Sequence, residues 1–235
     1  MREKEPIGAG KYRHEYKYVC RESTLAIVEG RLCSLMRPDP HAGEAGTYQV
    51  RSLYFDDPYG SCFLENENGT DPREKFRIRI YNGSAGRISL ELKEKTRGKT
   101  RKLACPLTEP QCRALMAGRP LPDSADHPPV LQKLLLLMRT RLYRPSVIVE
   151  YSRTPYIYPS GNVRVTLDRN IAASTAFSAF LDPEIPRRPV MEPGSHVLEV
   201  KFDEFLPDPI HNALQMNHLR QTAFSKYYLC KKFSL

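Results

Sequence analysis

The sequence predicts an α+β protein in which an antiparallel β-sheet, open or closed into a barrel, carries helices at its periphery. Three observations lead to this fold class. Segments that alternate apolar and charged residues recur along the 235 residues, as is typical of half-buried strands. Most of these segments follow one another through short turn signals, which favours antiparallel pairing. Stretches with helical spacing of apolar residues lie between the groups of strands.

The N-terminal part is expected to hold a leader, two strands and one helix. Residues 1–11 show no regular pattern and are interpreted as a flexible leader. Residues 12–20 alternate and predict a strand. Ser23 is expected to cap a helix that runs to about Arg37. A loop rich in proline and glycine then leads to a strand over residues 48–55.

The middle of the chain predicts three strands and two short helices. The strands are expected over residues 75–81, 87–95 and 101–107, and the helices over residues 110–117 and 130–142. Asn82-Gly83 is a strong hairpin signal, although the connecting loop is expected to be longer than two residues. Residues 97–100 are expected to form a charged turn.

The C-terminal part predicts further strands and one helix. Strands are expected over residues 146–156, 162–168 and 196–202, a helix over residues 209–219, and a closing segment over residues 225–229. Residues 171–193 are expected to be irregular and to lie over the body as a flap. No boundary interrupts residues 12–235, which we expect to form one domain.

Composition narrows the classes of function. Lys and Arg total 36 against 27 Asp and Glu, a net charge of +9 that favours an anionic partner. No segment approaches the roughly 20 apolar residues of a membrane span, and the N-terminus has no signal-peptide pattern. The six cysteines are scattered without Cys-x-x-Cys spacing, which disfavours structural zinc and favours reduced thiols in the cytoplasm. Glycine-rich phosphate loops and the common hydrolase motifs are absent.

Charged side chains fall on one face of strand after strand. The sets are Arg13, Glu15 and Lys17; Arg77 and Arg79; Glu91, Lys93 and Lys95; Arg164, Thr166 and Asp168; and Glu199 and Lys201. For any single strand, this alternation is explained by an ordinary antiparallel sheet with one face in solvent. Because Arg, Lys and Glu dominate with almost no small polar residues, a barrel with these faces inward is the second interpretation. Such a lumen would require a polyanion, and clustered phosphates fit best, with the glutamates holding a divalent metal.

Seven segments in order resemble the VTC domain, the polyphosphate polymerase domain of the vacuolar transporter chaperone family, within the CYTH-like triphosphate tunnel metalloenzymes. They are Tyr-Arg-His-Glu-Tyr-Lys-Tyr at 12–18 and the segments at 50–56, 75–81, 90–95, 149–154, 163–168 and 197–201. The resemblance implies an antiparallel eight-stranded β-barrel, the triphosphate tunnel. It also implies an enzyme that transfers the γ-phosphate of a nucleoside triphosphate such as ATP onto inorganic polyphosphate, with manganese or magnesium as cofactor.

The resemblance also implies roles for individual residues. The expected catalytic residues are Arg77, Arg79, Lys93, Arg153 and Arg164. The expected phosphate-binding residues are Lys17, Lys95, Lys102, Tyr151, Lys201 and Lys226, with Lys99 as an alternative to Lys102. Glu199 is the expected metal ligand, and Glu15 and Glu91 are further candidates. Structural explanations without a functional role are ion pairing for Glu91 and Glu199, a core position for Tyr151, and a solvated loop for Lys102.

Two departures from the family pattern bear on the reaction. The hydrolases of the superfamily begin with Glu-x-Glu-x-Lys, whereas Arg13 replaces the first glutamate here, which favours a basic tunnel that holds its product. Residues 62–71 lack an arginine where another phosphate ligand is expected. Hydrolysis of triphosphates and non-catalytic binding of polyphosphate, pyrophosphate or a phosphorylated partner therefore stay open as alternatives. Nucleic acid is disfavoured, because the basic strands lack interleaved exposed aromatics and a closed tunnel excludes a duplex.

Overall fold

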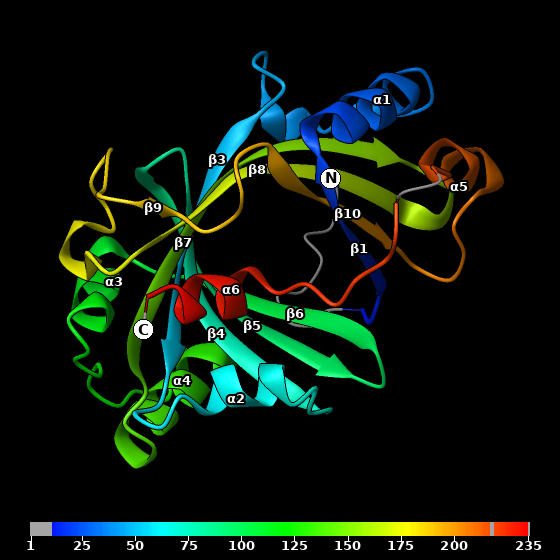
Figure 1. The fold of residues 1–235 in the computed structure, drawn as a ribbon. Helices are drawn as coiled ribbons and strands as arrows, with labels where there is room; N and C mark the ends of the chain where they lie inside the picture. Colours follow the sequence, from blue (N-terminus) through cyan, green and yellow to red (C-terminus); the bar gives the residue numbers. More distant parts are fainter. Residues whose placement is uncertain (1–10, 217–218, 235) are drawn as a thin grey trace, which may run out of the picture.

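The computed structural model describes residues 11–216 and 219–234, and within them an eight-strand path curls into a nearly closed barrel (Figure 1). In spatial order the strands are β1 (His14–Arg21), β10 (Ser195–Phe202), β8 (Val163–Ser174), β7 (Arg144–Tyr158), β3 (Tyr48–Asp56), β4 (Arg73–Tyr81), β5 (Ser84–Thr96) and β6 (Lys99–Pro106). All neighbours are antiparallel. The short strands β2 (Arg37–Pro38) and β9 (Arg188–Pro189) pair with β7 and β8.

The first and last strands of this path approach each other at one end. Arg13, just before β1, forms an antiparallel bridge to Thr100 of β6, with reciprocal backbone N–H···O bonds of 3.0 and 3.1 Å. Beyond this bridge, side chains connect the strands: the Thr100 hydroxyl of β6 donates to Glu15 of β1 at 3.1 Å, and Glu15 also pairs with Lys93 of β5. The predicted antiparallel, barrel-like α+β fold is thus confirmed, although backbone pairing among the described residues closes the barrel only at this bridge.

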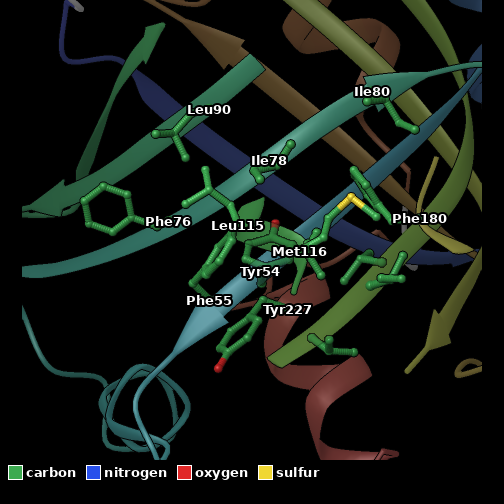
Figure 2. Close-up of a cluster of buried hydrophobic side chains, with 14 of the residues drawn as sticks. Tyr54, Phe55, Phe76, Ile78, Ile80, Leu90, Leu115, Met116, Phe180 and Tyr227 are labelled. Carbon is green, nitrogen blue, oxygen red and sulfur yellow. The ribbon is translucent and has the colours of Figure 1, made fainter. Parts of the chain in front are cut away.

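Six α-helices in the described parts of the chain lie against the sheet. They are α1 (Glu22–Cys33), α2 (Ser61–Glu67), α3 (Glu109–Met116), α4 (Pro129–Thr140), α5 (Asp208–Leu214) and α6 (Lys226–Lys232). On the outer face of the sheet, helix α3 packs against β5 and β7, and helix α4 packs against β5 and β6. Phe76, Ile78 and Leu90 join the larger apolar core with Leu115 and Met116 (Figure 2). Helices α1 and α5 cover a second core over β1, β8 and β10. Because strand side chains alternate, burial of these apolar rows turns the charged rows inward.

The structure corrects several local expectations. The hairpin loop between β4 and β5 is Asn82-Gly83 alone, with φ of 52° and 60°, as in a type I′ turn. The charged turn is likewise shortened to Arg97-Gly98. Ser23 lies inside α1, which begins at Glu22, so the predicted cap is wrong.

The segment predicted as an irregular flap over residues 171–193 is partly regular. Strand β8 continues to Ser174, and β9 pairs with it. Arg51, itself almost fully buried, holds the following segment by donating to the carbonyl oxygens of Phe180, Asp182 and Pro183 at 2.9, 2.5 and 3.1 Å. The flap is therefore anchored to the outside of the barrel.

The predictions for the N-terminal leader and the C-terminal elements can be compared with the structure only in part. Residues 1–10 of the predicted leader lie outside the described residues, as do residues 217 and 218 of the predicted C-terminal helix. That helix is shorter than expected, since α5 ends at Leu214. The closing segment is helix α6, which Ser225 caps through its hydroxyl. No helix within the described parts of the chain has the length and apolar character needed to cross a bilayer.

Candidate functional site: a tunnel lined by cations

The inner face of the barrel brings most of the predicted site residues together from six strands and helix α6. Because side chains alternate along each strand, every second residue points into the barrel, and the curl of the sheet brings these inward rows close together. The residues concerned are Lys17, Arg77, Arg79, Lys93, Lys102, Tyr151, Arg153, Lys201 and Lys226, with Glu15, Glu91 and Glu199 among them. We describe them as three groups: the arginine wall, the glutamate–lysine cluster and the Asp168 group.

The arginine wall consists of Arg77, Arg79, Glu91 and Lys102 on β4, β5 and β6. The guanidinium of Arg77 contacts the Glu91 carboxylate at 2.6 Å and donates to the Tyr54 hydroxyl at 2.8 Å. Arg79 lies 3.8 Å from the same carboxylate and donates to the Ser52 hydroxyl at 3.1 Å. These hydroxyl contacts hold both guanidinium planes in fixed orientations.

Glu91 is surrounded by cations. Its other oxygen accepts from Lys102 at 2.9 Å, and the residue is almost fully buried. Burial alone would raise its pKa, but the charges of Arg77, Arg79 and Lys102 outweigh burial and hold the pKa well below the usual range. A carboxylate with three cationic partners has little capacity left for a metal. The arrangement favours the ion-pairing alternative for Glu91.

The glutamate–lysine cluster consists of Glu15 and Lys17 on β1, Lys93 on β5, and Glu199 and Lys201 on β10. Glu15 lies 2.8 Å from Lys93 and 3.1 Å from Lys17. Glu199 lies 2.9 Å from Lys201 and 3.9 Å from Lys17, so one ammonium group lies between the two carboxylates. Burial opposes ionisation of Glu199, but the surrounding lysines lower its pKa and keep it charged.

The Asp168 group joins helix α6 to the barrel. Asp168 of β8 is fully buried and accepts two bonds from the Arg153 guanidinium, at 2.6 and 2.8 Å. Lys226, the first residue of α6, reaches the same carboxylate at 2.6 Å. The ring of Tyr151 lies 5.2 Å from the Arg153 guanidinium and 5.0 Å from the Lys226 ammonium. Tyr151 is therefore both a core residue and a cation–π platform.

Three predicted residues lie toward the edges of this interior. Arg164 is one-third exposed and pairs with Asp39 at 2.8 Å and with the Tyr48 hydroxyl at 3.1 Å. More than half of the Lys102 side chain is exposed despite its contact with Glu91. Lys95 follows Lys93 on the same face of β5, and no carboxylate of the described residues lies within 4 Å of it.

The proposed effect of Arg13 on the tunnel requires correction. Its guanidinium pairs with Asp203 at 2.9 Å and contacts the carbonyl oxygen of Asn162. Asp203 also accepts from Lys11 at 3.2 Å. The positive charge that replaces the first family glutamate is thus neutralised at the barrel end and adds little to the interior.

The segment expected to lack a phosphate ligand is largely helix α2. It carries no arginine or lysine from Ser61 to Glu67. Asn66, near its end, accepts a hydrogen bond from Lys75 at 2.6 Å. Lys75 and Asp168 are site residues to which the sequence reasoning gave no role. Both share strand parity with assigned residues, Lys75 with Arg77 and Asp168 with Arg164, and this was the available signal.

The interior does not hold a preformed metal centre of protein ligands alone. Within residues 11–216 and 219–234, no three His, Cys, Asp or Glu side chains gather closely enough to bind an ion. Glu15 and Glu199 come nearest to this role, because they share Lys17 and belong to adjacent strands.

Comparisons relate the chain to known proteins. A putative adenylate cyclase from Bacillus halodurans has the same fold, with a TM-score of 0.50 and 13% identity over 81% of this chain and 80% of its own. The putative adenylyl cyclase HpAC1 from Hippeastrum, with a dominant triphosphatase activity, gives a TM-score of 0.42 and 13% identity over 82% and 80%. No curated protein matches the chain. The VTC domain model matches residues 12–234, and the chain therefore belongs to the VTC domain family.

Proposed function

We propose that the tunnel binds phosphate chains and that the protein is a metal-dependent polyphosphate polymerase. It would transfer the γ-phosphate of a nucleoside triphosphate, such as ATP, to the end of an inorganic polyphosphate chain. Membership of the VTC domain family supports the choice of reaction. The superfamily fold supports the more general statement that the ligand is a triphosphate or a longer phosphate chain.

One observation carries the proposal: the cations of the interior outnumber its carboxylates. Four carboxylates, those of Glu15, Glu91, Asp168 and Glu199, lie among a larger number of guanidinium and ammonium groups. Buried like charges repel unless they are compensated. A linear polyanion compensates them along the whole tunnel, and arginine forks match phosphate oxygens in geometry as well as charge.

The side chains can perform this transfer by positioning and charge stabilisation. Arg77, Arg79 and Arg153 would hold the triphosphate and neutralise charge on the equatorial oxygens of the moving phosphoryl group. A terminal oxygen of the polyphosphate forms the new bond to the γ-phosphorus. The bond from that phosphorus to the bridging oxygen breaks, and a nucleoside diphosphate leaves. The attacking oxygen is already anionic, so no general base is required.

A divalent cation fits only part of the carboxylate set. Glu199 and Glu15 offer oxygen donors on adjacent strands and could hold Mn²⁺ or Mg²⁺ together with substrate phosphates, in the manner preferred by Mg²⁺. When bound, such an ion would neutralise phosphate charge. Glu91 and Asp168 fit less well, because each shares an oxygen with a buried arginine guanidinium, whereas the charged partners of Glu15 and Glu199 are flexible lysines.

A second function, non-catalytic binding of polyphosphate, is favoured by one specific feature. Each of the four interior carboxylates already lies against a cation of the protein, so a metal must displace at least one lysine. If that displacement does not occur, the tunnel binds chains without turnover. Hydrolysis of triphosphates is the third outcome that the same interior permits, with water in place of the polyphosphate end.

Incubation with ATP and Mn²⁺, followed by polyphosphate detection on a gel and a phosphate assay, separates these functions. The polymerase yields polymer and nucleoside diphosphate. Release of orthophosphate alone would identify a hydrolase, and tripolyphosphate binding without either product would identify a binder. Replacement of Arg77 and Arg79 by Met should abolish all three. Lys133→Met is the matched control, because Lys133 pairs with Glu74 outside the tunnel.

A further inference from the structure

Lys75 lies between strand β4 and the two helices that approach it. It occupies the same face of β4 as Arg77 and Arg79, and it lies directly opposite Lys93 of β5. Its ammonium donates to the side-chain oxygen of Asn66 in α2 at 2.6 Å and to the hydroxyl of Ser225, which caps α6, at 3.2 Å. The row of phosphate-binding candidates on β4 therefore continues for one more position.

All hydrogen-bond partners of this ammonium are neutral. The ring of Tyr227 lies 4.9 Å from it, and no carboxylate within the described residues lies closer than 4 Å. The neighbouring lysines of the tunnel differ, because Lys17, Lys93 and Lys226 lie 3.1, 2.8 and 2.6 Å from carboxylates. A half-buried ammonium without a counter-ion is poorly compensated and favours an anionic ligand.

The charges around Lys75 make this position unfavourable for a proton in the free protein. Burial lowers its pKa to about 7, and nearby Arg73, Lys93 and Lys17 act in the same direction. Two acidic groups of α2, the thiol of Cys62 and the carboxyl of Glu65, face it without forming an ion pair. A phosphate group beside the ammonium would favour the protonated form of Lys75 and so raise its pKa.

We propose that Lys75 is a phosphate-binding residue of the tunnel and that it takes up a proton from solvent when a polyphosphate chain binds. This inference rests on the proposed phosphate-binding function and adds a residue and a pH dependence to it. Only the protonated side chain binds phosphate well. Affinity should therefore be highest at low pH and should fall as the pH rises through the pKa of the free protein.

The experiment is calorimetric titration with inorganic tripolyphosphate, without metal, between pH 6 and pH 9. Lys75→Arg keeps the charge at every pH, whereas Lys75→Gln keeps a polar group without charge. The wild-type affinity should approach that of K75R at pH 6 and that of K75Q at pH 9. The two variants should differ about tenfold, as expected for one charge-assisted hydrogen bond. Titration of the ligand itself is common to all three proteins and cancels in the comparison.

Proton uptake gives a second and more direct readout. Repeating the titration at pH 7.5 in buffers of different ionisation enthalpy counts the protons that accompany binding. Wild-type protein should take up roughly three-quarters of a proton more than either variant, given a free-state pKa of about 7. A residue that merely ties α2 and α6 to β4 would change stability without changing this count.

The controls separate failure of this inference from failure of the proposed function. Lys133→Met should match the wild type in affinity and proton count, since Lys133 pairs with Glu74 on the outer face. If wild-type protein binds tripolyphosphate but has the same pH profile and proton count as K75R, the role of Lys75 is wrong and the tunnel function stands. If wild-type protein does not bind tripolyphosphate, both fail. The comparison of wild type with K75R tests the role of Lys75 even if K75Q does not fold.

Discussion

The arginine wall and the glutamate–lysine cluster line the same tunnel with different chemistry. In the wall, the side chains of Arg77 and Arg79 are 13% and 8% exposed and are fixed by the hydroxyls of Tyr54 and Ser52. In the cluster, Lys93 and Lys201 are 30% and 32% exposed, and the partners of their ammonium groups among the described residues are carboxylates. The two arginines of the wall are therefore held by more kinds of partner than the two lysines of the cluster.

This difference suggests that the two regions have different roles in the proposed function. Planar guanidinium groups in fixed orientations suit the positioning of phosphate oxygens. Lysines are flexible point charges and can leave a carboxylate when a phosphate chain or a metal arrives. We therefore expect substitutions in the wall to weaken binding or folding, and substitutions of the cluster carboxylates to affect turnover.

The largest expected effect is on turnover, from Glu199→Gln in the cluster. Loss of the proposed metal ligand should lower metal-dependent polymer synthesis by roughly a thousandfold, because a bound ion contributes several kcal/mol to such a transfer. Binding of tripolyphosphate without metal should change by less than about threefold. Parallel turnover and binding assays measure both, with the exposed Glu192→Gln as control. Retained activity would show that Glu199 does not hold the metal.

The next largest effect is on stability, from Glu91→Gln in the wall. Removing the shared carboxylate leaves the guanidinium groups of Arg77 and Arg79 uncompensated and should cost about 3–5 kcal/mol of unfolding free energy. Glu74→Gln breaks an exposed pair with Lys133 and should cost at most about 1 kcal/mol. Urea denaturation of both variants at neutral pH measures the difference. Equal losses would contradict the structural role assigned to Glu91.

Glu91 should also contribute to acid sensitivity. Its pKa is held well below the value of the unfolded chain, so it stabilises the fold above about pH 4. That stabilisation is lost as the pH falls through the depressed pKa of the folded state. The unfolding free energy of the wild type should therefore decline more steeply between pH 5 and pH 2 than that of Glu91→Gln.

A smaller effect, on affinity, is expected from Arg77→Lys. This change keeps the charge but removes the fork that contacts both Glu91 and the Tyr54 hydroxyl. Tripolyphosphate binding should weaken about tenfold to a hundredfold, the range for a lost charge-assisted hydrogen bond. Calorimetric titration measures the change. An affinity within twofold of the wild type would show that charge alone matters in the wall.

The smallest effect is expected from the converse change in the cluster, Lys201→Arg. The side chain is one-third exposed and makes a single ion pair with Glu199, so either cation can occupy the position. Affinity for tripolyphosphate should stay within about threefold of the wild type. If this variant and Arg77→Lys behave alike in the same titration, the distinction between the two regions does not hold.

Much of the fold could be predicted because its signals are local. Alternation of charged and apolar residues correctly placed β4 and the inward orientation of Arg77 and Arg79. The predicted length of the loop between β4 and β5 was wrong, and the reason is also local. Ser84 to Gly86 lack alternation and resemble a loop, yet Asn82-Gly83 sets the register so that Ser84 pairs with Tyr81.

The site was predicted less completely than the strands. The sequence identified most of the lining residues, but it assigned Glu91 to a metal that its three cationic partners disfavour. It gave no role to Asp168, which holds Arg153 and Lys226 together. Both points have the same cause, because strand parity reports which face a side chain occupies and not which neighbour it meets.

The sequence by itself determined the strands, the charge of their inner rows and the family, since these depend on residue type and on the two-residue period of a strand. Only the tertiary structure decided which charges neutralise one another. Glu15 meets Lys93, and Asp168 meets Lys226, across many residues of chain. The physical reason is closure: curling the sheet brings rows from distant strands within ion-pair distance, and no local pattern encodes that pairing. The same closure leaves Lys75 without a carboxylate of its own among the described residues, which makes it a candidate ligand for the phosphate chain.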